Sequence, residues 1–92
     1  MVYLISYDLR DPDRDYPKVS AALETAAEGG YCRPLQSVWL VRSSKSVEQM
    51  NDALSGAVDS SDNFLILPVD VHGGFSAKLP RMETDRIKAL LR

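Results

Sequence analysis

The 92-residue sequence predicts one α+β domain with the element order strand–helix–strand–strand–helix–strand. Three observations predict this order. Apolar runs of strand length recur along the chain, segments with helical spacing separate them, and turns rich in Gly or Asp lie where they meet. The length suits one modest core, and 45% hydrophobic with 26% charged residues is typical of a globular protein.

The first strand is expected at residues 2–8, Val-Tyr-Leu-Ile-Ser-Tyr-Asp. Its β-branched and aromatic residues favour a strand. Neither of its alternating faces carries a charge before the last residue, which is typical of a central strand that is covered on both sides. Asp8 then lies at the carboxyl end of this strand, which makes it the first candidate for chemistry.

A first helix is expected after the turn-rich loop at residues 9–15. Apolar residues recur at helical spacing between Tyr16 and Ala26, and Asp15 suits the N-cap of this helix. Gly29-Gly30 is typical of the turn that ends a helix.

Two further strands are expected at residues 31–35 and 37–42. The second is apolar on both faces. The first contains Pro34, which cannot donate to a sheet, so this short strand is expected at an edge.

The second half repeats the pattern. Ser46 and Gln49 form a capping-box sequence that opens a second helix, and an apolar strand is expected at residues 64–71. A short extra strand at residues 75–79 and a terminal helix over residues 80–92 complete the prediction.

This order predicts the ferredoxin-like arrangement, a four-stranded antiparallel sheet with two helices on one face, formed by residues 1–72. Residues 73–92 form a C-terminal extension with a short helix, expected to pack on the domain or on a dimer partner. The helix-free face would carry apolar residues from three strands, and the extension is too short to cover it alone. The sequence therefore predicts a homodimer with sheets packed face to face, and Tyr7, Trp39 and Val41 are expected in its interface.

Charge is unevenly distributed, although the net charge is only −2. Residues 1–70 carry eleven acidic and six basic side chains, whereas residues 71–92 carry two acidic and five basic ones. The basic tail is either a solvated helix face or a patch for phosphates or for an acidic partner. No apolar run is long enough for a membrane span, and the single Cys32 fits a reducing cytoplasm.

Three short motifs resemble the small CRISPR-associated Cas-two family. They are Tyr7-Asp8 at the end of the first strand, Leu35-Gln36-Ser37-Val38-Trp39, and Ile66-Leu67-Pro68 after an Asp-rich turn. The opening strand and Ser37–Val41 look most like the SinR-like branch, and the VapD-type ribonucleases share the layout. The resemblance covers residues 2–71 and implies a homodimer of ferredoxin-like subunits.

The resemblance also implies a site. Some members of that family are described as metal-dependent nucleases that use an Asp at the end of the first strand, which here is Asp8. A Mg²⁺ ion, which Mn²⁺ can replace, would take one or two carboxylates and phosphate oxygens, and Asp11 is a second candidate ligand. The alternative interpretation is that Asp8 only accepts hydrogen bonds from turn amides.

Several polar residues are candidates for binding nucleic acid. Four arginines lie near strand ends that flank Asp8, and each is able to hold a phosphate with two hydrogen bonds: Arg10, Arg14, Arg33 and Arg42. By the same resemblance, Ser37 corresponds to the serine in the third strand of that family, and it is a further candidate for binding nucleic acid. Arg10 and Arg14 have a second interpretation, in which they only neutralise the acidic loop around them.

The expected function is therefore that of a homodimer that binds RNA or DNA and cleaves phosphodiester bonds. Two alternatives stay open. One is a non-catalytic dimeric adaptor or regulatory protein that binds a protein partner through its C-terminal tail, and the other is a VapD-like ribonuclease toxin. The acidic balance of residues 1–70 argues against a simple basic surface for duplex DNA.

Overall fold

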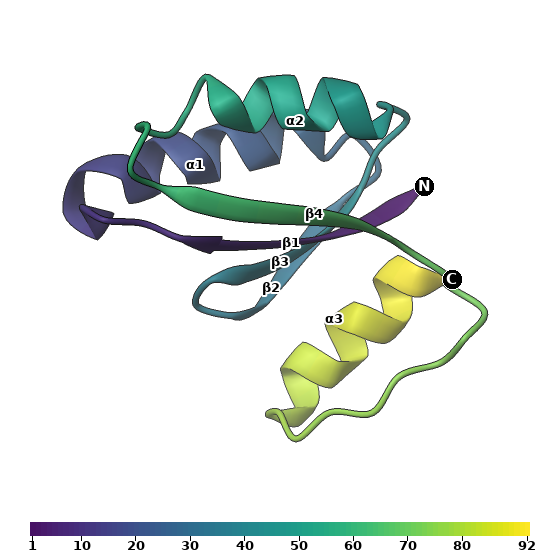
Figure 1. Cartoon of the computed structure of the whole chain (residues 1–92). Helices are drawn as coiled ribbons and strands as arrows, with labels where there is room; N and C mark the ends of the chain where they lie inside the picture. Colours follow the sequence, from purple (N-terminus) through teal and green to yellow (C-terminus); the bar gives the residue numbers. More distant parts are fainter.

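The computed structural model contains a four-stranded sheet and three helices (Figure 1). It describes the backbone of residues 1–92 and every side chain except those of residues 12–15. The elements, in chain order, are β1 (Val2–Asp8), α1 (Pro12–Ala26), β2 (Tyr31–Leu35), β3 (Val38–Arg42), α2 (Val47–Ser55), β4 (Asn63–Val69) and α3 (Arg81–Leu91).

The strands lie in the order β2-β3-β1-β4, and each neighbouring pair is antiparallel. Helices α1 and α2 lie together on one face of the sheet, whereas α3 lies on the other (Figure 1). This is the ferredoxin-like fold, so the predicted fold class is confirmed. The prediction that β1 is central is also confirmed, because β1 pairs with β3 on one side and with β4 on the other.

Local sequence signals account for most element boundaries. The capping box at the start of α2 is present, because the N–H of Gln49 donates to Ser46 Oγ (3.2 Å) and the N–H of Ser46 donates to Gln49 Oε1 (2.8 Å). Helix α1 begins at Pro12 and not after Asp15. Proline suits this position because the N–H of a first helical residue has no partner within the helix, so its absence costs nothing. The expected N-cap at Asp15 was therefore wrong, and so was the strand at residues 75–79, which the structure leaves irregular.

Both edge strands of the sheet contain a proline. Pro34 lies in the edge strand β2, as predicted, and Pro68 lies in the opposite edge strand β4. Neither residue has a backbone N–H to offer to a further strand.

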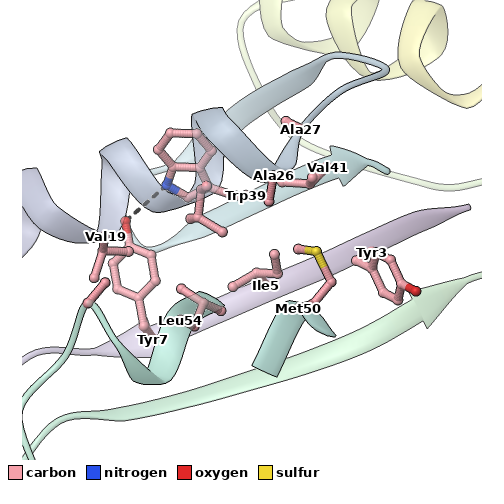
Figure 2. Packing of buried hydrophobic residues seen from close by; sticks show 12 residues of the cluster. Tyr3, Ile5, Tyr7, Val19, Ala26, Ala27, Trp39, Val41, Met50 and Leu54 are labelled. Atoms are coloured by element: carbon pink, nitrogen blue, oxygen red, sulfur yellow. Dashed lines mark hydrogen bonds between the residues drawn. The ribbon is translucent and has the colours of Figure 1, made fainter. Parts of the chain in front are cut away.

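The main core lies between the sheet and helices α1 and α2 (Figure 2). Strand β1 supplies one of its alternating faces to this core, and the helices supply their apolar stripes. The buried residues of the cluster are Tyr3, Ile5, Tyr7, Val19, Leu23, Ala26, Ala27, Trp39, Val41, Met50, Leu54 and Ala57.

The expected dimer-interface residues lie in this core, so that prediction was wrong. Tyr7, Trp39 and Val41 are exposed by 5%, 2% and 0%. Their side chains point toward the helices, on the face that one chain already covers by itself (Figure 2). A second copy packing on the opposite face of the sheet would therefore not touch them.

Helix α3 covers part of the other face of the sheet. Ile87 and Leu90 are buried against Cys32 of β2 and Leu40 of β3. Helix α3 thus covers the half formed by β2 and β3 and leaves Leu65 and Leu67 of β4 exposed, which agrees with the expectation that the tail is too short to cover this face alone. None of the helices in the described chain combines the length and the apolar character needed to span a membrane.

Arg42 ties the end of α3 to the sheet. Its guanidinium donates to the carbonyl oxygen of Leu90 from Nε (3.1 Å) and Nη2 (2.6 Å), and to that of Arg92 (2.9 Å). The last carbonyls of a helix have no partner within the helix, so a cation there stabilises its end. The Arg42 side chain runs over Gly29, where an added Cβ would lie only 2.7 Å from Arg42 Cγ.

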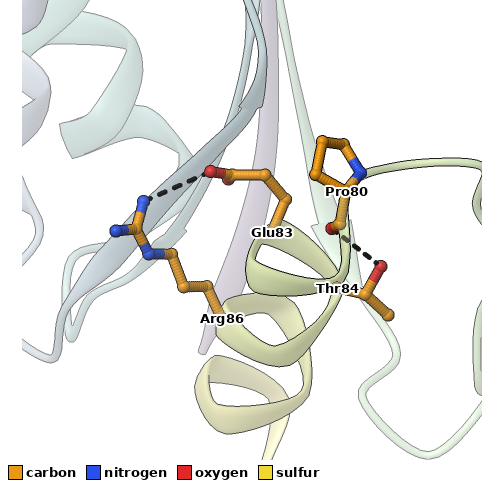
Figure 3. A network of polar contacts seen from close by, with 4 residues as sticks. All are labelled: Pro80, Glu83, Thr84 and Arg86. Atoms are coloured by element: carbon orange, nitrogen blue, oxygen red, sulfur yellow. Dashed lines mark hydrogen bonds and ion pairs between the residues drawn. The ribbon is translucent and has the colours of Figure 1, made fainter.

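The first turn of α3 has its own polar contacts (Figure 3). The carbonyl oxygen of Pro80 accepts hydrogen bonds from the N–H groups of Glu83 (3.0 Å) and Thr84 (3.2 Å), and Thr84 Oγ1 lies 3.5 Å away. Glu83 and Arg86 form an ion pair at 3.3 Å one turn apart. These contacts are local and exposed, so docking of α3 depends mainly on Arg42 and on its apolar face.

The half of the sheet formed by β1 and β4 has no helix over this face. Leu65 and Leu67 of β4 project from it and are exposed by 53% and 48%. They pair with Ser6 and Leu4 of β1, so this exposed apolar surface extends toward Asp8. We call Leu65, Leu67 and the adjacent Ser6 the open strip, since Leu4 and Val69 pack partly against the cluster beneath α3.

A carboxylate secures the loop between β3 and α2. Glu28 Oε1 accepts hydrogen bonds from Ser43 Oγ (3.1 Å), Ser44 N–H (3.2 Å) and Ser44 Oγ (2.8 Å). The bonds from Ser44 and then Ser43 lower the pKa of Glu28, with a smaller contribution from Lys45. A carboxyl whose pKa is lowered by folding stabilises the fold above its unfolded pKa, and this contribution is lost as pH falls through the folded pKa.

We therefore expect Glu28→Gln to be less stable than wild type at neutral pH, by a small margin because the site is exposed. The difference should vanish in acid, where wild-type Glu28 is protonated. Urea unfolding midpoints of both proteins across an acidic-to-neutral pH series measure this. A difference that stays constant across the series would contradict it.

Candidate functional site

The most prominent polar site lies at the end of the sheet where β1 finishes. Asp8 is exposed and pairs across the sheet with Asn63, the first residue of β4. A shallow pocket of about 250 Å³ lies here, lined by Ser6, Tyr7, Asp8, Asn63, Phe64 and Leu65. The Asp8 carboxylate thus has oxygen-bearing side chains beside it and the open strip next to it.

A buried carboxylate that the sequence did not single out supports this end of the sheet. Asp62 is 8% exposed. Its Oδ1 accepts from the N–H of Arg10 (2.7 Å) and its Oδ2 from the N–H of Asp59 (2.8 Å). Asp62 therefore joins the loop after β1 to the loop before β4. Its position in an Asp-rich turn gave no signal that it alone would be buried.

Ser37 lies at the same end of the sheet. Its carbonyl oxygen accepts from the N–H of Tyr7 (3.2 Å), which places Ser37 beside the last residues of β1. Asp8 and Ser37 therefore lie at the same end of the sheet, but Ser37 is not among the residues that line the Asp8 pocket.

Other predicted site residues are placed differently. Arg10 and Asp11 are exposed in the loop after Asp8, whereas the side chain of Arg14 lies outside the described residues. Arg42 is half-buried at the opposite end of β3, where its guanidinium holds the end of α3. The expectation that Arg42 lies near Asp8 was wrong, because Arg42 pairs with Val2 at the other end of β1 and its Nε and Nη2 donate to helix carbonyls.

A second polar cluster lies on the β2–β3 hairpin. The carbonyl oxygen of Gln36 accepts from Arg33 Nε (3.0 Å) and Nη2 (2.7 Å), from Tyr7 OH (3.4 Å) and from Tyr16 OH. Trp39 Nε1 donates to Tyr7 OH at 3.0 Å. Burial raises the pKa of Tyr7, so this hydroxyl stays protonated and available as a donor.

Aromatic rings and a guanidinium are stacked beside this hairpin, on the face of the sheet that also carries α1. The Arg33 guanidinium lies 4.3 Å from the ring centroid of Tyr16 and 5.8 Å from that of Trp39. The ring of Tyr31 stacks on Trp39 with centroids 5.0 Å apart and planes 30° apart. The Tyr31 hydroxyl donates to Glu24 Oε1 (3.1 Å), and this bond raises the pKa of Tyr31.

Tyr31 was not recognised as a functional candidate from the sequence. A tyrosine in an edge strand is common, and its position over Trp39 follows from the pairing of Tyr31 with Val41 between β2 and β3. No spacing within either strand indicates that register.

Comparison with known proteins extends the fold assignment but names no activity. No family model matches the chain, and no curated protein matches it. A crystal structure of a hypothetical protein, TT1823 from Thermus thermophilus, is similar, with a TM-score of 0.62 and 23% sequence identity over 86% of this chain and 89% of that one. At this identity the likeness supports the shared ferredoxin-like fold alone.

Proposed function

We propose that this protein is a Cas-two-like homodimer that acts on nucleic acid, with Asp8 as the residue at which a phosphodiester bond is hydrolysed. The observation that carries the proposal is the position of Asp8. It is an exposed carboxylate at the end of the central strand, in a pocket with Ser6 and Asn63, and it borders an uncovered apolar strip.

A second copy of the chain is the proposed occupant of the open strip. Leu65 and Leu67 are about half exposed and lie on the same face of the sheet as Asp8. Burying them against the same residues of a second copy removes apolar area from water at a symmetric contact. Two Asp8 carboxylates would then lie at the border of one interface.

The residues around Asp8 suit a hard divalent cation. Mg²⁺ binds proteins through one or two carboxylates and keeps several waters or phosphate oxygens. Asp8 supplies a carboxylate, and Ser6 and Asn63 line the same pocket with a hydroxyl and an amide. When bound there, the ion would supply an activated water and neutralise charge on the phosphate, while Asp8 holds it in place.

The test is cleavage of labelled single-stranded RNA, single-stranded DNA and duplex DNA in Mg²⁺ or Mn²⁺. We expect Asp8→Asn to reduce the rate to about one hundredth of wild type or less, the loss typical when one key electrostatic group is removed. Asp85→Asn is the matched control, because Asp85 is an exposed carboxylate on α3. Equal rates for wild type and Asp8→Asn would exclude this role of Asp8.

The role of the second copy is tested separately with Leu67→Glu. This change places a charge on the open strip, so we expect a monomer by sedimentation, a wild-type circular dichroism spectrum and lower cleavage. If the Leu67→Glu variant stays dimeric, the interface lies elsewhere on the molecule.

A non-catalytic adaptor is the second candidate, and one observation favours it. Helix α3 packs on β2 and β3 and keeps exposed basic side chains, which the chemistry proposed at Asp8 does not use. An adaptor needs only the paired subunits and a surface for a protein partner, for which exposed Arg81 and Lys88 of α3 are available. A wild-type dimer that cleaves none of the three substrates would favour it, whereas cleavage of RNA alone would favour a VapD-like ribonuclease.

A further inference from the structure

The edge strand β2 presents an aromatic ring and a guanidinium that the proposed chemistry at Asp8 does not use. Tyr31 is 45% exposed, and Arg33 is exposed beside it. Both side chains lie on the face of the sheet that carries Trp39, because the Tyr31 ring stacks on Trp39 and the Arg33 guanidinium lies 5.8 Å from its ring centroid. No strand pairs with the other side of β2.

Both groups are already fixed in position within one chain. The ring of Tyr31 rests on buried Trp39, and its hydroxyl is bonded to Glu24. The Arg33 guanidinium lies over the ring of Tyr16 and donates twice to the Gln36 carbonyl. A ligand that stacks on these groups would therefore incur little of the entropy cost of ordering them.

We infer that Tyr31 and Arg33 form a stacking site for the bases of a single-stranded nucleic acid. This inference rests on the proposed function and gives it a substrate-binding surface at the same sheet. Proteins that bind single strands combine aromatic rings, on which bases stack, with arginine, which stacks and contacts phosphate. A duplex keeps its bases inside the helix and offers no free ring face to such a site.

The charges around the site determine how a strand would lie. Glu24 faces Tyr31 from α1 and repels phosphate, whereas Arg33 lies beside Gln36 at the turn of the hairpin, at the end of the sheet where β1 finishes. The phosphates are therefore expected on the Arg33 side, with a base over Tyr31. With few cations nearby, stacking rather than phosphate contact supplies most of the affinity.

The experiment measures binding of a fluorescein-labelled twelve-nucleotide oligothymidylate to the full chain by anisotropy. EDTA is present, so cleavage at Asp8 plays no part. We expect Tyr31→Leu to weaken binding about tenfold, as loss of one stacking partner does. Tyr31→Phe keeps the ring and should bind like wild type, whereas Glu24→Gln removes a repulsive charge and should bind more tightly. Arg33→Gln should weaken binding by a similar factor.

An oligonucleotide of equal length with abasic sites separates stacking from phosphate attraction. Wild type should bind it about tenfold more weakly than the thymidylate strand, and it should bind a blunt duplex weakly as well. Equal binding of the abasic and thymidylate strands, equal binding by Tyr31→Leu and wild type, or no binding by wild type would each overturn the inference. Because Asp8→Asn should bind normally in EDTA yet fail to cleave in Mg²⁺, failure of the stacking site is distinguishable from failure of the Asp8 proposal.

Discussion

Replacing Trp39 with alanine is expected to lower the free energy of unfolding by about 3–5 kcal/mol, the range found when a large aromatic side chain is removed from a core. Trp39 is 2% exposed, stacks with Tyr31 and donates a hydrogen bond to Tyr7. Truncation leaves a cavity between β3 and α1 and removes a partner of the Tyr7 hydroxyl. Urea unfolding followed by circular dichroism measures the loss.

Two variants control this prediction. Trp39→Phe keeps most of the ring and loses the indole donor, so we expect a loss of about 1–2 kcal/mol. Leu67→Ala truncates a side chain that is about half exposed, and it should hardly change the folding of one chain. If Trp39→Ala unfolds like wild type, Trp39 does not lie in the core of a single chain.

The second large effect concerns the docking of α3. Ile87→Asp places a carboxylate in the buried contact of α3 with β2 and β3, where Ile87 is 4% exposed. Removal of a buried isoleucine costs about 2–5 kcal/mol, and an unpaired buried charge adds to this. We expect α3 to leave the sheet while the ferredoxin-like part of the chain stays folded, because the main core contains no residue of α3.

Cys32 reports this change without an added label. Its thiol is 4% exposed beneath α3, and burial raises its pKa, so alkylation of the wild type should be slow. In Ile87→Asp the rate should rise at least tenfold and approach that of a free cysteine. Met82→Asp is the matched control on the same helix, since Met82 is 65% exposed. Slow alkylation in Ile87→Asp would show that α3 is held by other contacts.

The sequence predicted the four paired strands and the helices α1 and α2 because these elements depend on local patterns. Hydrophobic spacing, the capping box at Ser46 and the glycines after α1 act within a few residues. The start of α1 was missed because both Pro12 and Asp15 suit a helix start, and the sequence did not decide between them.

The face on which each strand residue lies was not predictable in the same way. Alternation separates the two faces of a strand but does not tell them apart when both are apolar, as in β1 and β3. For this reason Tyr7, Trp39 and Val41 were assigned to the wrong face. The role of Arg42 was missed because its partners lie 48 and 50 residues away in sequence.

Asp8 was named as a candidate site residue because it lies at the end of a strand, and the sequence pattern predicts strand ends well. Its surroundings were not identifiable, because Asn63 and Ser37 come from distant segments that only strand pairing brings together. Tyr31 was not identifiable for the same reason. Arg33 was a candidate phosphate ligand from the sequence, but its stacking on Tyr16 depends on contacts between segments that are distant in sequence.

The prolines in β2 and β4 have a consequence for how the protein behaves at high concentration. The outer margin of an open sheet is a template on which further chains can add and grow into fibrils. Pro34 and Pro68 interrupt that template on both flanks, because each lacks a donor where an incoming chain would need one. The molecule can thus leave Leu65 and Leu67 exposed while its edge strands disfavour the addition of further chains.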